Sequence, residues 1–173
     1  MLLDLTRYRR PVDHFTRTFE PAEVAGEGDA YQVVAPVVLD FEIQKDKDRF
    51  HLIGTVKTEL ELPCSRCLEP FRMLVDTTFD ARFHPAAELD AAEEREVDED
   101  DLETSYYRDD QLDLNELLRE QFYLALPMKP LCREDCRGLC PVCGTNRNTA
   151  TCGCEHVWED PRLAPLKGLS KPN

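Results

Sequence analysis

Hydrophobic and polar residues alternate along three segments of the chain, which is the pattern of β-strands with one buried face. All three are rich in β-branched and aromatic residues, which favour strands. The segments are 31–43, 50–62 and 71–83. The polar stretch 44–48 predicts a turn, and Pro36 predicts an edge position or a bulge. Successive strands with short connections indicate an antiparallel sheet with one face exposed to water.

A helical periodicity follows at residues 112–126, where apolar residues recur three and four positions apart. Asp113 suits an N-cap with Glu116 three residues later, and Pro127 ends the pattern. We expect a helix over 113–126 that packs its apolar stripe on the sheet. The stripe consists of Leu114, Leu117, Leu118, Phe122 and Ala125. Asp160 followed by Pro161 predicts a second, short helix.

Charge is unevenly distributed along the 173 residues, whose net charge is −14. Residues 1–128 carry a net −16, whereas residues 129–173 carry a net +2. Segment 88–110 is rich in acids and poor in apolar residues, which predicts a solvated acidic loop; the alternative is a docking site for a basic partner. Any contact with RNA is therefore expected to come from a local patch in the C-terminal part.

Apolar runs are short, because the longest, 33–39, holds seven residues. A membrane-spanning helix needs about 20, so we expect none and no membrane partner. The first basic residues follow a short apolar stretch, which is the reverse of a secretory signal, and this order favours a cytoplasmic location.

Eight cysteines occur in four closely spaced pairs, which favours metal ligation over disulfides in a cytoplasmic chain. The pairs are Cys64/Cys67, Cys132/Cys136, Cys140/Cys143 and Cys152/Cys154. Pro141 and Gly144 permit the tight turn that aims two sulfurs at one ion. We therefore expect a zinc site in which Cys140 and Cys143 are joined by Cys152 and Cys154.

A second zinc site could use the remaining four cysteines, Cys64, Cys67, Cys132 and Cys136, and would fasten the C-terminal segment to the sheet. Free thiols or a disulfide are the alternatives, and spacing alone leaves one or two ions open. Four arginines lie in or beside the pairs, where they could neutralise thiolates or contact RNA. These are Arg66, Arg133, Arg137 and Arg147.

These patterns predict an α+β fold with two parts. Residues 1–128 are expected to form an antiparallel sheet, which could curve toward a barrel, with one packed helix and the acidic loop. Residues 129–173 are expected to form a cysteine-rich segment resembling a zinc ribbon, ending in the short helix.

An ordered series of motifs resembles the YceD family, the large ribosomal RNA subunit accumulation protein. The series comprises the CxxC segment 64–71, the helix from Asp113 to Pro127, segment 136–144 and segment 160–164. The resemblance implies a role in accumulating or processing large-subunit rRNA, and hence in ribosome biogenesis. Members of the family need not carry all the C-terminal cysteines, whereas this chain has the full set.

No constellation typical of an enzyme is found in the sequence. The four histidines are scattered, and the glycines match no phosphate-binding loop. A zinc ion held by four cysteines has no open position for water, so it is structural. We predict a non-catalytic protein. The alternatives are a thiol redox protein that uses Cys64 and Cys67, or a zinc carrier.

The functional hypothesis assigns the two charged regions to different partners. Basic residues of the C-terminal segment are expected to meet large-subunit rRNA or a pre-ribosomal particle, and the acidic loop a basic ribosomal protein. The proposed RNA-binding residues are Lys129, Arg133, Arg137, Arg147 and Lys167.

Overall fold

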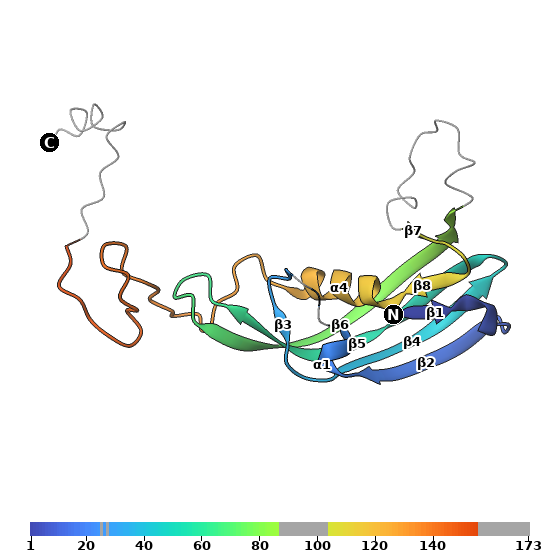
Figure 1. Ribbon diagram of the computed structural model, residues 1–173, viewed down its shortest axis with the longest axis horizontal. Helices are drawn as coiled ribbons and strands as arrows, with labels where there is room; N and C mark the ends of the chain where they lie inside the picture. The colour runs from blue at the N-terminus through green and yellow to red at the C-terminus, as the bar shows by residue number, and fades with distance from the viewer. Residues whose placement is uncertain (25, 27, 87–103, 156–173) are drawn as a thin grey trace, which may run out of the picture.

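A curved, mainly antiparallel sheet dominates the computed structural model (Figure 1), which describes residues 1–24, 26, 28–86 and 104–155. The main sheet has the order β2-β4-β5-β6-β7, with β3 paired to β5, and β1 and β8 form a separate pair. The elements are β1 (Leu2–Asp4), η1 (Leu5–Arg7), β2 (Val12–Phe19), α1 (Pro21–Val24), β3 (Gln32–Val33), β4 (Val37–Asp46), β5 (Arg49–Pro63), β6 (Pro70–Pro85), β7 (Thr104–Tyr107), β8 (Gln111–Asp113) and α4 (Leu114–Ala125).

The predicted meander is confirmed by β4, β5 and β6. A two-residue turn at 47–48 joins β4 to β5, with Lys47 at a φ of 55°. Strand β5 pairs with β6 over nearly its whole length, from Phe50 opposite Phe83 to Pro63 opposite Pro70. Alternate residues of β4 and β5 are buried, as the sequence pattern predicted, and in β6 Val75, Phe79 and Phe83 are buried.

Three parts of the predicted sheet need correction. The first predicted strand is interrupted around Pro36, which lies between β3 and β4, because proline cannot donate to a strand ladder. Residues 104–107, predicted as part of the acidic loop, form β7, which pairs with β6 in parallel. Within the described residues the sheet stays open and does not close into a barrel. Strand β2 was not predicted.

Helix α4 confirms the predicted helix and its N-cap. The side chain of Asp113 accepts the backbone N–H of Asn115, and Leu114, Leu118 and Phe122 are at most 2% exposed. The helix lies along one face of the sheet (Figure 1). Its buried residues belong to the same hydrophobic core as Phe19 and Phe41 of the sheet. The predicted short helix at residue 160 lies outside the described residues.

Gly54 shows why the centre of the sheet is tightly specified. A Cβ added there would collide with the Cβ of Phe41, in the facing position of β4. Only glycine therefore allows the two strands to approach this closely.

The long β5–β6 hairpin extends beyond α4, and residues 129–155 lie at its tip (Figure 1). This arrangement places Cys64 and Cys67, which follow β5, beside the C-terminal cysteines. No helix in the described part of the chain is long and apolar enough to cross a membrane.

Candidate metal centres

The turn at the tip of the β5–β6 hairpin aims two cysteines at one point. The backbone N–H of Cys64 donates to the carbonyl of Glu69, and that of Leu68 donates to the carbonyl of Cys64, both over 2.9 Å. Leu68 adopts a φ of 62°, which closes the turn. Cys64 and Cys67 are 0% and 4% exposed.

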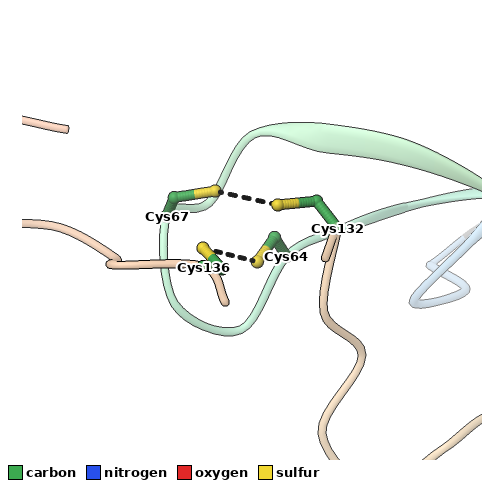
Figure 2. Close-up of side chains that lie close together, drawn as sticks. All are labelled: Cys64, Cys67, Cys132 and Cys136. Atoms are coloured by element: carbon green, nitrogen blue, oxygen red, sulfur yellow. Dashed lines mark hydrogen bonds between the residues drawn. The ribbon is translucent and has the colours of Figure 1, made fainter. Parts of the chain in front are cut away.

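Four cysteines from two distant segments meet at this tip, and we call them the inner cluster: Cys64, Cys67, Cys132 and Cys136. Their sulfurs all lie within 4.8 Å of one another. The Sγ atoms of Cys64 and Cys136 are 3.8 Å apart, as are those of Cys67 and Cys132 (Figure 2). Phe71 and Leu131 pack against the cluster and shield it from water.

Backbone contacts fasten the 130–139 segment to the hairpin tip. The N–H of Ser65 donates to the carbonyl of Pro130 over 2.8 Å, and that of Leu139 to the carbonyl of Arg66 over 3.0 Å. The guanidinium of Arg66 donates to the carbonyl of Cys136 over 2.8 Å. Gly138 has a φ of 69°, and a Cβ there would lie 2.9 Å from the carbonyl of Arg66. Glycine is therefore required for this close approach.

The remaining cysteines form a second group, the outer cluster: Cys140, Cys143, Cys152 and Cys154. Their sulfurs also lie within 4.8 Å of one another. The turn closes when the N–H of Gly144, at a φ of 72°, donates to the carbonyl of Cys140 over 2.8 Å. Cys143 and Cys154 are exposed. The structure thus gathers the eight cysteines into two groups of four, the expected outer group and the inner group that the sequence had left open.

Each cluster has a donor set that fits a metal ion such as zinc, and the inner cluster also has the size. All eight residues are free cysteines. Zinc prefers four sulfurs at tetrahedral corners about 2.3 Å away, which requires sulfurs about 3.8 Å apart. The measured separations of 3.8 Å in the inner cluster meet this requirement. Four thiolates would fill every position around the ion, leaving none for a reacting water.

In the inner cluster the pKa values of the thiols are driven apart. Burial acts to raise the pKa of Cys64, but three backbone N–H groups, those of Cys132, Cys67 and Arg66, outweigh it and lower the pKa to about 6. Burial, followed by contact with the other sulfurs, raises the pKa of Cys132 to about 12. A bound cation is therefore what would allow all four groups to be thiolates together.

In the outer cluster, too, one thiol has a lowered pKa and another a raised pKa, and both of these cysteines are exposed. Hydrogen bonding from the side chain of Thr145 lowers the pKa of Cys143 to about 6. The side chain of Cys154 hydrogen-bonds with that of Cys143, and this contact is the main reason that the pKa of Cys154 is raised to about 12. Thr145 was not singled out from the sequence, although its position two residues after Cys143 lets it reach the sulfur.

The basic residues near the cysteines differ in whether their side chains already bind a neighbouring group. Arg66 and Arg133 are engaged in local contacts, Arg133 with the side chains of Asn148 and Asp135. Within the described residues, Lys129, Arg137 and Arg147 have exposed side chains without a hydrogen bond or ion pair. The fifth predicted residue, Lys167, lies outside the described residues.

Asn148 is a member of the site that sequence reasoning missed. Its Nδ2 donates to the Sγ of Cys136 over 3.3 Å, and its Oδ1 accepts the backbone N–H of Arg137 over 2.8 Å. A single asparagine in a loop has no distinctive spacing, so only the folded arrangement identifies it.

A family model described as large ribosomal RNA subunit accumulation protein YceD matches residues 52–170. The chain belongs to the YceD family. The matched region includes both cysteine clusters, most of the β5–β6 hairpin and α4. The resemblance drawn from the motifs is thereby confirmed.

Relatives of this YceD family member occur in bacteria and plants. Uncharacterized proteins of Mycobacterium tuberculosis and Mycobacterium bovis are 32% identical over 99% of this chain and 82% of their own length. A protein of Zea mays named large ribosomal RNA subunit accumulation protein YCED homolog 1, chloroplastic, is 27% identical over 79% of this chain and 54% of its own. No solved structure matches the chain significantly.

Proposed function

We propose that this YceD family member is a non-catalytic ribosome biogenesis factor that supports the accumulation of large-subunit rRNA. The observation that carries the proposal is the family match over residues 52–170, whose name and whose maize relative both refer to this RNA. Sites in which four cysteines surround an ion fit a binding module better than an enzyme, because they leave no open position on the ion.

In this proposal each cysteine cluster holds one zinc ion with a structural role. Residues 129–155 contribute nothing to the main hydrophobic core, which is built from residues 3–122. Such a segment lacks enough apolar surface to fold on burial alone. Zinc would supply the missing free energy, and the inner ion would fix the segment to the β5–β6 hairpin.

The RNA-binding surface is assigned to exposed cations of the cysteine segment. Lys129, Arg137 and Arg147 have side chains able to reach phosphates, whereas Arg133 already binds Asn148 and Asp135. Lys167 stays in the proposal on sequence grounds alone. Because the chain as a whole is acidic, the contact must be short-ranged and sensitive to salt.

The acidic segment is assigned to a basic ribosomal protein, on its composition alone. Residues 88–103 belong to the predicted acidic loop, of which the structure describes the part from Thr104 onward. A run of carboxylates attracts a basic protein surface and accelerates association at low salt.

Sedimentation of cell extracts through sucrose gradients tests the RNA surface. The double change Arg137→Glu with Arg147→Glu should shift the protein from pre-ribosomal fractions to the top of the gradient. A matched control is Arg9→Glu with Arg10→Glu, which reverses the same charge between η1 and β2, at the opposite end of the sheet (Figure 1). Equal sedimentation of both variants and the parent protein would refute RNA contact through this segment.

Thiol redox chemistry at Cys64 and Cys67 is the weaker alternative. An exchanging pair must be reached by its substrate, and these thiols are 0% and 4% exposed within a group of four sulfurs. A zinc carrier would release its ion readily, which the burial of the inner cluster disfavours.

A further inference from the structure

The two clusters differ sharply in their access to solvent. In the inner cluster Cys64, Cys67 and Cys136 are at most 4% exposed, and Phe71 and Leu131 cover them. In the outer cluster Cys143 and Cys154 are both exposed. Small oxidants and chelators can therefore reach two sulfurs of the outer cluster directly, and none of these three in the inner cluster.

The clusters also differ in how firmly the backbone holds them. Cys64 and Cys67 lie between the paired ends of β5 and β6, and the hydrogen bonds of Ser65 to Pro130 and of Leu139 to Arg66 tie their turn to the segment that carries Cys132 and Cys136. The outer pair Cys152 and Cys154 lies in segment 151–155, which makes no backbone–backbone hydrogen bond within the described part of the chain. A Cβ added at Gly153 would meet nothing within 4 Å. Segment 151–155 is thus less constrained than the segments of the inner cluster, which allows Cys154 to shift toward Cys143.

Building on the zinc binding proposed above, we infer that the outer cluster is an oxidation-sensitive site in which peroxide joins Cys143 to Cys154 and releases the zinc ion. The inner cluster keeps its ion under the same conditions. One chain therefore combines a permanent zinc site that anchors the segment with a second site that responds to oxidants.

The chemistry balances with hydrogen peroxide as the oxidant. The sulfur of one exposed thiolate attacks a peroxide oxygen, giving a sulfenic acid and hydroxide. The second thiolate displaces hydroxide from that sulfenic acid to form the disulfide. Two protons convert the two hydroxides to water, and the two electrons lost by sulfur reduce the peroxide. With two thiolates gone, Cys140 and Cys152 alone hold zinc too weakly, so the ion leaves into water.

Residues 146–149, in the loop between the two outer cysteine pairs, limit how far the change spreads. The N–H of Arg147 donates to the carbonyl of Gly138 over 2.9 Å, and Asn148 binds Cys136. The partners in these contacts, Gly138 and Cys136, lie beside or in the inner cluster, so the contacts should survive loss of the outer ion. Oxidation should therefore reorganise the turn at 140–144 and segment 150–155, while residues 146–149 stay attached.

The test uses the full chain, purified with zinc under reducing conditions and then exposed to graded hydrogen peroxide. Native mass spectrometry counts the ions, and alkylation before and after reduction identifies the oxidised cysteines. The expected sequence is loss of one ion from two, with Cys143 and Cys154 becoming alkylated only after reduction. The outer thiols should oxidise on the order of tenfold faster than the inner ones, because thiolate access sets the rate.

Two substitutions that leave every cysteine in place test whether burial protects the inner cluster. Phe71→Ala removes part of the apolar cover of the inner cluster and should speed the loss of the inner ion toward that of the outer one. Val142→Ala, at a 60% exposed position between two outer cysteines, is the matched control and should change neither rate.

The possible outcomes separate this inference from the proposed function. Simultaneous loss of both ions, earlier loss of the inner ion, or no oxidation of Cys143 and Cys154 would overturn the inference and leave zinc binding intact. A chain that holds no zinc before peroxide is added would overturn the zinc sites themselves. RNA association is measured separately in the gradient experiment.

Discussion

The Nδ2 of Asn148 lies 3.3 Å from the Sγ of Cys136 and donates a hydrogen bond to it. Asn148 comes from the loop between the outer cysteines, whereas Cys136 belongs to the inner cluster. The Oδ1 of the same side chain accepts from the guanidinium of Arg133 and from the backbone N–H of Arg137, both over 2.8 Å. One amide therefore joins the outer loop to the inner cluster and helps to lower the pKa of the Cys136 thiol.

Replacing this amide by a carboxylate should weaken zinc binding at the inner cluster. Asn148→Asp keeps the shape and the acceptor oxygens but removes the donor to sulfur and places a negative charge beside it. Residues that support metal ligands in this way typically contribute 10- to 100-fold in affinity, so a loss of about tenfold is expected. Competition with a chromophoric chelator at fixed pH measures it.

The neighbouring Asn146 provides a control with the same change of charge. Its Oδ1 accepts the backbone N–H of Asn148 over 3.0 Å, a role that an aspartate can also fill. Asn146→Asp should therefore change zinc affinity much less than Asn148→Asp. Equal losses in the two variants would mean that added charge, and not the missing donor, weakens binding.

How far the sequence predicts the fold depends on whether a signal is local. The strands of the meander and helix α4 were predictable because alternation and helical spacing are properties of single segments. Strand β7 was not, because its four residues pair in parallel with β6, a distant partner that no local pattern reveals. Strand β2 was missed because only Phe15 and Phe19 mark its inward face, at every fourth residue instead of every second.

The same distinction holds for the candidate metal centres. Cysteine spacing predicted the outer group, since each of its pairs is a local motif, but it left open whether the other four cysteines meet. The division of the arginines was not predictable, because Arg66 and Arg137 look alike in sequence. The guanidinium of Arg66 binds the carbonyl of Cys136, whereas the side chain of Arg137 is exposed. The two arginines differ only because the folded chain packs the hairpin tip, which carries Arg66, against residues 130–139.

Truncating a core residue of α4 should destabilise the sheet domain strongly. Leu118 is 0% exposed, so Leu118→Ala should lower the free energy of unfolding by about 2–5 kcal/mol through lost burial and the cavity left behind. Leu124 lies on the same helix but is 73% exposed, and Leu124→Ala should change it by no more than about 0.5 kcal/mol. Urea unfolding of both variants makes the comparison. Similar losses would contradict the packing of the helix.

Alkaline pH should reveal the environment of Tyr31, which packs edge-on against Phe122 and Tyr123. Burial, followed by the nearby carboxylate of Asp29, raises its pKa from 10.0 to about 12. The unfolded chain loses this proton first, so the stability that the neutral phenol contributes falls as pH rises from 10 to about 12. Unfolding measured across this range should depend less on pH in Tyr31→Phe. Equal pH dependence of variant and parent would contradict the raised pKa.

Removing zinc should unfold the cysteine segment and leave the sheet folded. The main core contains residues from Leu3 to Phe122 and none from 129–155, so its burial does not depend on the clusters. Among the described residues, the small cluster around Cys64 has only Phe71 and Leu131 as larger apolar neighbours, too few to hold the segment alone. Structural zinc contributes about 10–16 kcal/mol in small finger peptides. After treatment with a strong chelator, amide exchange should rise throughout 130–155 and stay slow in β4, β5 up to Leu62, and α4. Fast exchange in the central strands as well would show that the ions support the whole chain, and unchanged exchange in 130–155 would show that the segment folds without them.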